Sequence, residues 1–150
     1  FEAALDEQNI TYKQLDTRPA PLTTLLWSAN VETENAYLLG SYSFFDSQPI
    51  SFESYPKNHA LLGNLAESES VKRMIGISKG WYTINRKDDE LYFNDLRFGL
   101  LSFAPQSQNF VFKYKLSSDA AGNVIFTEEP KDERDGRELL IGLWQRIRGN

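Results

Sequence analysis

The chain has 150 residues, the length of one domain, and 41% of them are apolar, which argues against a disordered protein. Its net charge of −5 argues against the clustered basic surface that nucleic-acid binding requires. There is no cysteine and only one histidine, His59, so the chain alone cannot build a cysteine- or histidine-rich metal centre. No apolar run reaches the roughly 18–20 residues of a membrane-spanning helix.

The first part of the chain predicts a short helix followed by strands. Residues 1–9 include good helix formers and stop at Asn9. Because Phe1 stands inside this helical pattern, we expect the chain to be a fragment or a matured form of a longer protein. Alternating apolar residues predict a first strand at Ile10–Asp16, and two prolines make residues 17–21 extended or turning. Further strands are expected at Leu25–Glu32, Ala36–Phe45 and Ile50–Tyr55.

The middle of the chain predicts a helical part and then a hairpin. Two short apolar stretches in residues 61–79 indicate a central helix that ends near Gly80. Aromatic and β-branched residues predict strands at Gly80–Asn85 and Leu91–Gly99, joined by the charged turn Arg86–Glu90. Since strand side chains alternate, one face of the second arm carries two apolar residues, an acid and a base: Leu91, Phe93, Asp95 and Arg97.

The last part predicts strands at Phe110–Leu116 and Val124–Thr127 and a helix at Asp132–Arg148. The helix is amphipathic, with one apolar stripe made of Leu139, Leu140, Leu143, Trp144 and Ile147. We expect the stripe to pack on a sheet; its acidic first turns argue against the alternative of a helix on a membrane surface. Together these elements predict a single α+β domain with a mostly antiparallel sheet of about seven or eight strands, a central helix and an amphipathic C-terminal helix.

Asp95 and Arg97 are the first candidate site residues. Arg97 could bind an anion with two parallel hydrogen bonds while Asp95 orients it or holds a cation. The alternative is an ion pair inside the sheet, which is the more common arrangement. Arg18, in the proline-flanked segment, could meet the same site or lie at the surface.

Two tryptophans and one further acid complete the candidates. Trp27 and Trp81 are expected as core or rim anchors, with ligand stacking as the alternative. Asp46 and Asp95 could form an acid–base pair, although turn chemistry already explains Asp46. His59 is expected as a surface or capping residue. We predict no catalytic residue and no metal ligand in these 150 residues.

Four motifs, in order, carry a resemblance to a known family. They are Thr17–Trp27 (TRPAPLTTLLW), Phe45–Asp46, Ser78–Tyr82 (SKGWY) and Asp95–Gly99 (DLRFG). The series resembles the C-terminal soluble region of bacterial inner-membrane proteins known as membrane-bound metal-dependent hydrolases. The resemblance covers roughly the first two-thirds of the chain.

The resemblance implies an enzyme whose divalent metal is held by histidine and aspartate in an N-terminal membrane part. This chain would then be a soluble accessory domain, partnered by its own transmembrane region and associated with the inner membrane on either side. Its candidate contacts are Arg18, Trp27, Trp81, Asp95 and Arg97. No cofactor is expected in the domain itself.

Two other functions stay open. One is a non-enzymatic domain that binds an anionic or lipid-like ligand in a cleft lined by Trp27, Trp81 and Arg97. The other is a self-contained hydrolase that uses Asp46 and Asp95.

Overall fold

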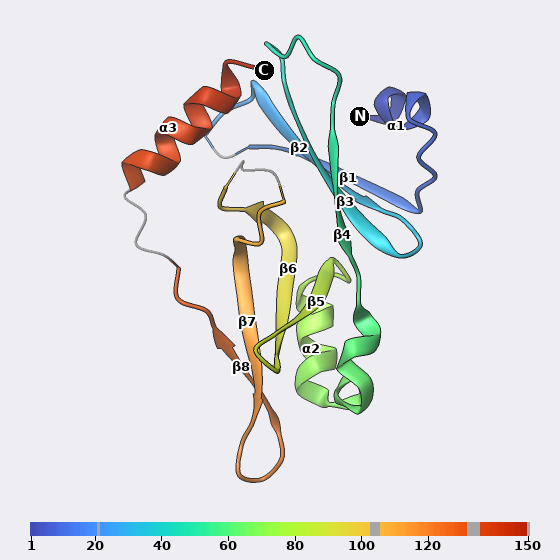
Figure 1. The fold of residues 1–150 in the computed structure, drawn as a ribbon, viewed down its shortest axis with the longest axis vertical. Helices are drawn as coiled ribbons and strands as arrows, with labels where there is room; N and C mark the ends of the chain where they lie inside the picture. Colours follow the sequence, from blue (N-terminus) through green and yellow to red (C-terminus); the bar gives the residue numbers. More distant parts are fainter. Residues whose placement is uncertain (21, 103–105, 132–135, 150) are drawn as a thin grey trace. The chain divides into compact units, whose positions relative to one another are not determined.

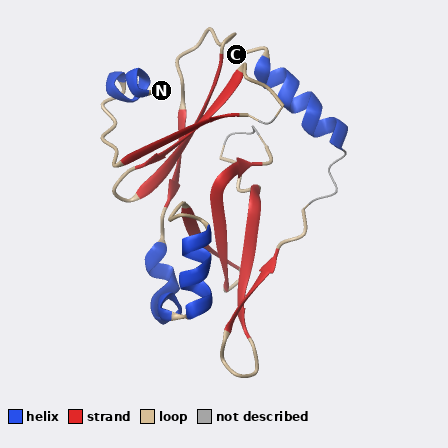
Figure 2. Ribbon diagram, turned by 180° about the vertical axis from the view of Figure 1, so that it is seen from behind, coloured by secondary structure: helices blue, strands red, loops and turns tan. Residues whose placement is uncertain are grey.

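Eight strands in the described residues form two sheets. The structure is a computed structural model that describes residues 1–20, 22–102, 106–131 and 136–149. Each sheet has four antiparallel strands in chain order, β1-β2-β3-β4 and β5-β6-β7-β8 (Figures 1 and 2). The predicted α+β class with antiparallel strands is therefore confirmed, but the strands do not join into one sheet, because the chain leaves the first sheet after β4 and enters a helical segment.

The strands of the first sheet are β1 (Gln14–Pro19), β2 (Leu26–Glu32), β3 (Ala36–Ser43) and β4 (Phe52–Pro56). Those of the second are β5 (Tyr82–Lys87), β6 (Glu90–Leu100), β7 (Phe110–Ser118) and β8 (Val124–Glu128). The helical elements are α1 (Glu2–Glu7), the 3-10 segment η1 (His59–Glu67), α2 (Glu69–Ile77) and α3 (Gly136–Ile147).

The chain divides into two compact units, each containing one sheet. Unit 1 joins the described residues of Phe1–Pro56, Ser102–Gln106 and Glu133–Asn150. Unit 2 joins those of Lys57–Leu101 and Ser107–Asp132. The prediction of a single domain stays a prediction.

Helix α1 covers one face of the sheet in unit 1. Its residue Leu5 is fully buried against Ala29 and Val31 of strand β2. Helix α1 ends before Asn9, which has the left-handed backbone (φ 54°) common just after a helix. In the middle of β3, Gly40 leaves room for the Phe52 ring, whose Cδ1 would lie 2.8 Å from an added Cβ.

The core of unit 2 lies between the sheet and its helical segment. Val71 of α2 and Leu62 of η1 are buried against Ile84 and Phe93, which pair across β5 and β6. The helical segment bends at Gly63, whose backbone is not helical (φ 49°, ψ −131°).

Most strand boundaries differ from the prediction by one or two residues, and two differences have a local cause. Strand β1 begins at Gln14, four residues after the predicted start at Ile10. Ile10 and Tyr12 pack on the core of unit 1 from outside the sheet. The turn between β5 and β6 is shorter than the predicted turn Arg86–Glu90. Asp88 and Asp89 alone form this turn, with positive φ of 50° and 61°, as a two-residue hairpin requires.

The C-terminal helix exposes most of its apolar stripe. Ile147 is buried, whereas Leu139, Leu140 and Trp144 are exposed. The predicted beginning of this helix, at Asp132, lies outside the described residues, as does Pro21.

Candidate functional site

Asp95 and Arg97 form a two-residue ion pair on strand β6. The Arg97 Nη2 donates to Asp95 Oδ2 at 2.6 Å, and its Nε lies 3.1 Å from both carboxylate oxygens. The Arg97 backbone N–H also donates to Asp95 Oδ1 at 2.9 Å. The side chain of Asp95 is 4% exposed and that of Arg97 is 23% exposed. The hydrogen bond to Asp95 raises the pKa of Arg97.

Strand pairing fixes where this ion pair lies. Asp95 stands opposite Tyr82 on β5 and Phe112 on β7, so its side chain shares a face with the apolar core of unit 2. The register between β6 and β7 shifts between Asp95 and Leu100, and the positive φ of Gly99 (70°) falls in that interval. The predicted face of β6 is therefore confirmed. Its apolar residues are followed by Asp95 and Arg97, where the pairing with β7 becomes irregular.

Trp81 belongs to the same unit and is buried. It precedes β5, and its carbonyl oxygen accepts a hydrogen bond from the Leu96 N–H at 3.0 Å. Its side chain is a core residue, which is the structural role expected of an aromatic anchor.

Arg18 and Trp27 belong to unit 1. Arg18, on β1, is ion-paired with Asp16 two residues earlier. Trp27, on β2, is half-buried, and its indole Nε1–H donates to the Thr24 carbonyl oxygen at 2.9 Å. Each side chain thus has a local partner within its own unit. The structure therefore places the five candidates in two groups, Trp81, Asp95 and Arg97 in unit 2, and Arg18 and Trp27 in unit 1.

A second buried ion pair joins Asp46, which the sequence analysis considered, to Arg146, which it did not. Arg146 of α3 donates from Nη1 and Nη2 to the two oxygens of Asp46 at 2.7 and 2.8 Å. It also donates to the Ser41 hydroxyl and carbonyl oxygens, each at 3.0 Å. The Asp46 side chain is 3% exposed and that of Arg146 is 14% exposed. The sequence offered no signal for this pair, because its members are 100 residues apart.

The same region fixes the end of helix α3. The Ser43 hydroxyl donates to the Ile147 carbonyl oxygen, one of the groups that a helix leaves unpaired at its C-terminus. Gly149 has φ 90°, and a Cβ there would lie 3.0 Å from the Asp46 nitrogen and closer still to the Phe45 carbonyl group. We call these contacts of Ser41, Ser43 and Asp46 with residues 146–149 the C-terminal clip.

His59 has a packing role in unit 2. Its ring stacks on that of Tyr82, with centroids 4.0 Å apart and planes 8° apart. Its Nε2 lies 2.9 Å from the Tyr82 carbonyl oxygen. The residue is half-buried rather than exposed as a surface position would be. The Tyr82 ring stacks in turn on Phe93, and burial raises the pKa of Tyr82.

The residues described do not fit a metal. Within the described ranges, no group of three or more histidine, cysteine, aspartate or glutamate residues is placed to hold an ion. Asp46 and Asp95 are both bound by arginine, and His59 is stacked.

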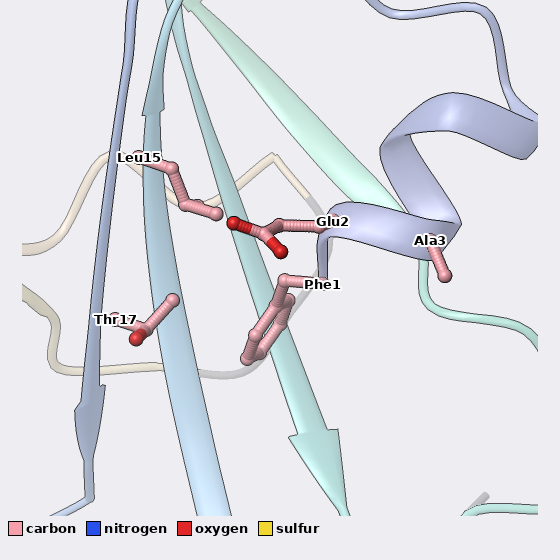
Figure 3. A pocket seen from close by; sticks show the side chains of 5 residues that line it. All are labelled: Phe1, Glu2, Ala3, Leu15 and Thr17. Carbon is pink, nitrogen blue, oxygen red and sulfur yellow. The ribbon is translucent and has the colours of Figure 1, made fainter.

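Two shallow hollows lie elsewhere. In unit 1 a hollow of about 360 Å³ lies between helix α1 and strand β1, where the Glu2 carboxylate extends toward Leu15 (Figure 3). In unit 2 a hollow of about 300 Å³ lies beside the ion pair of Glu90 and Lys115. Neither hollow is lined by any of the five candidate residues.

No helix within the described residues is long and apolar enough to cross a membrane. Comparison of the chain with protein-family models, with curated proteins and with solved structures gave no match.

Proposed function

We propose that this chain is the accessory domain of a membrane-bound metal-dependent hydrolase whose metal site lies outside these 150 residues. The order of the four motifs, from Thr17–Trp27 to Asp95–Gly99, supports the family. The observation that carries the accessory role is the state of the two candidate carboxylates. Asp46 and Asp95 each accept two or more hydrogen bonds from an arginine of the same unit.

Such a carboxylate is a poor catalyst. A general base needs a free lone pair within hydrogen-bond reach of the proton that it removes. A bidentate arginine donates to both oxygens, which leaves fewer lone pairs for a substrate proton. Asp46 and Asp95 therefore suit a structural role better than proton transfer.

In this proposal the domain covers, regulates or feeds a metal site held by the membrane part of the protein, at the inner membrane. The central helix and an amphipathic C-terminal helix belong to the proposal as elements that the domain could present to that part. The alternative is a non-enzymatic domain that binds an anionic or lipid-like ligand. Unchanged binding by Arg97→Ala would count against a ligand held by Arg97.

The proposal is tested on two proteins. The isolated 150-residue chain should hold no stoichiometric metal and should not hydrolyse esters or phosphoesters, with or without chelator. The longer gene product should hold a divalent metal, and its Asp95→Asn variant should keep that metal. Chelator-sensitive turnover by the isolated chain would overturn the proposal, and so would a longer product that binds no metal.

A further inference from the structure

Large apolar side chains are exposed on two loops of unit 1. Leu22, before β2, is 92% exposed, and Phe44 and Phe45, after β3, are 60% and 58% exposed. Leu25 is exposed as well. Proteins rarely leave adjoining large apolar side chains in water unless the surface binds something. We call Leu22, Leu25, Phe44 and Phe45 the apolar tip.

The two loops adjoin at one end of the sheet. Leu26 pairs with Ser43 across β2 and β3, so the loop before one strand meets the loop after the other. The Phe44 N–H donates to the Leu25 carbonyl oxygen at 3.0 Å. The C-terminal clip brings the last turn of α3 to Phe45 as well.

Backbone N–H groups on both loops of the tip are already hydrogen-bonded. Leu25 N–H donates to the Thr23 hydroxyl at 3.0 Å, and Phe45 N–H donates to the Ser43 hydroxyl at 3.2 Å. The Asp46 N–H donates to the Ser43 carbonyl oxygen at 3.0 Å. Satisfied backbone groups lower the cost of moving a loop out of water into an apolar layer. Leu22 is moreover held at φ 64°, an uncommon conformation for leucine that displays its side chain to solvent.

One cation lies next to the tip, although the chain carries −5 overall, because Arg148 directly precedes Gly149, the residue that contacts Phe45. Asp46 is cancelled by Arg146, and Arg18 is paired with Asp16. The Arg148 guanidinium carbon lies 5.3 Å from the centre of the exposed Trp144 ring. A tryptophan beside an arginine is typical of a membrane–water interface, where a ring and a cation contact lipid headgroups.

We propose that the apolar tip, flanked by Trp144 and Arg148, inserts shallowly into the surface of an anionic lipid bilayer. Leucine and phenylalanine would enter the boundary between headgroups and acyl chains, while the arginine would contact lipid phosphates. The proposal rests on exposed side chains, backbone hydrogen bonds and charge, and it needs neither the hydrolase nor a metal.

Vesicle flotation with the 150-residue chain tests the proposal. The probes are vesicles of phosphatidylcholine alone and vesicles with about one quarter phosphatidylglycerol. We expect partition into the anionic vesicles with a blue shift of tryptophan fluorescence, and weaker partition as salt is raised. Phe44→Ser/Phe45→Ser should lower the partition coefficient about tenfold or more, because most of the inserted apolar area is lost.

Two further variants separate insertion from unfolding. Leu22→Gly should also weaken partition, yet glycine suits the left-handed backbone at this position, so the fold should not suffer. Ile77→Ser/Phe98→Ser removes side chains of unit 2 that are 51% and 55% exposed, and it should bind vesicles like the wild type. Arg148→Glu should weaken binding to anionic vesicles more than to neutral ones.

Three results would overturn the proposal. The first is no partition of the wild-type chain into anionic vesicles. The second is equal loss in the unit 2 control, which would indicate non-specific adsorption. The third is a dimer in light scattering that Phe44→Ser/Phe45→Ser dissociates, since the tip would then bind a second copy. None of these results bears on where the hydrolase metal lies.

Discussion

At the scale of single residues, two buried carboxylates each depend on one arginine. Asp95 is nearly inaccessible, and Arg97 is its bidentate partner. Removing one member of a buried pair leaves the other charge without compensation in a poorly solvated place, which is far costlier than losing a surface pair. The cost should therefore fall unequally on the two partners, because Arg97 reaches solvent and Asp95 does not.

Arg97→Ala is accordingly expected to lower the free energy of unfolding by about 3 kcal/mol, since the Asp95 carboxylate stays buried. Asp95→Asn should cost less, because the Arg97 guanidinium can turn to water. Urea unfolding at neutral pH measures both. Lys13→Ala is the matched control, because its ion pair with Glu34 lies at the surface, and its unfolding midpoint should not move. Equal effects of the Arg97 and Lys13 variants would show that Asp95 is solvated in the folded protein.

At the scale of elements, the C-terminal clip holds the end of α3 against the loop after β3. Gly149→Ala should disrupt it for two reasons, the left-handed backbone and the clash with the Phe45 carbonyl group. We expect a loss of about 2–3 kcal/mol in the free energy of unfolding. Amide hydrogen exchange should quicken in α3.

The control is Gly142→Ala in the same helix. No atom lies within 4 Å of an added Cβ there, so alanine should stabilise the protein by about 0.5–1 kcal/mol through its helix propensity. If both variants behaved alike in urea unfolding, the contact of Gly149 with Phe45 would carry no stability.

The local sequence pattern predicted individual strands better than it predicted how the strands join into sheets. Alternation along β6 gave the correct face for Phe93 and Asp95, because that pattern depends on neighbouring residues alone. The first strand was placed too early, since Ile10 looks like a strand residue whether it packs on a core from a loop or from a sheet. The division into two sheets depends on which strands pair after the chain leaves β4. The hydrophobic pattern of a single strand does not predict its neighbours.

The candidate site shows the same limit. Asp95 and Arg97 lie two residues apart on one strand face, so the sequence indicated their contact directly. The contact of Asp46 with Arg146 joins distant parts of the chain, and turn chemistry gave a sufficient local explanation for Asp46. Trp27 and Trp81 were grouped by residue type, and the structure assigns them to different units.

At the scale of the whole molecule, buried phenols should make stability fall in alkaline solution. Burial raises the pKa of Tyr82 and Tyr114, and burial with a hydrogen bond to Glu53 raises that of Tyr55. In the unfolded chain a phenol loses its proton near pH 10, whereas the folded protein holds it to higher pH. The unfolded state then binds fewer protons, so the free energy of unfolding falls as pH rises from about 10 toward the raised values.

Tyr82→Phe keeps the ring that stacks on Phe93 and removes one of these phenols. The variant should match the wild type below about pH 9 and lose stability less steeply above about pH 10. Urea unfolding across this range gives both slopes. Parallel slopes would mean that the Tyr82 phenol ionises as readily in the folded protein as in the unfolded chain.

The C-terminal clip also has a consequence for synthesis on the ribosome. Asp46 leaves the ribosome 100 residues before Arg146, the residue that neutralises it. At a translation rate of about 5–20 residues per second, this interval lasts about 5–20 seconds. During that time the nascent first sheet lacks the arginine that neutralises this carboxylate in the finished protein, so unit 1 completes its fold only when the last turn of α3 has been made.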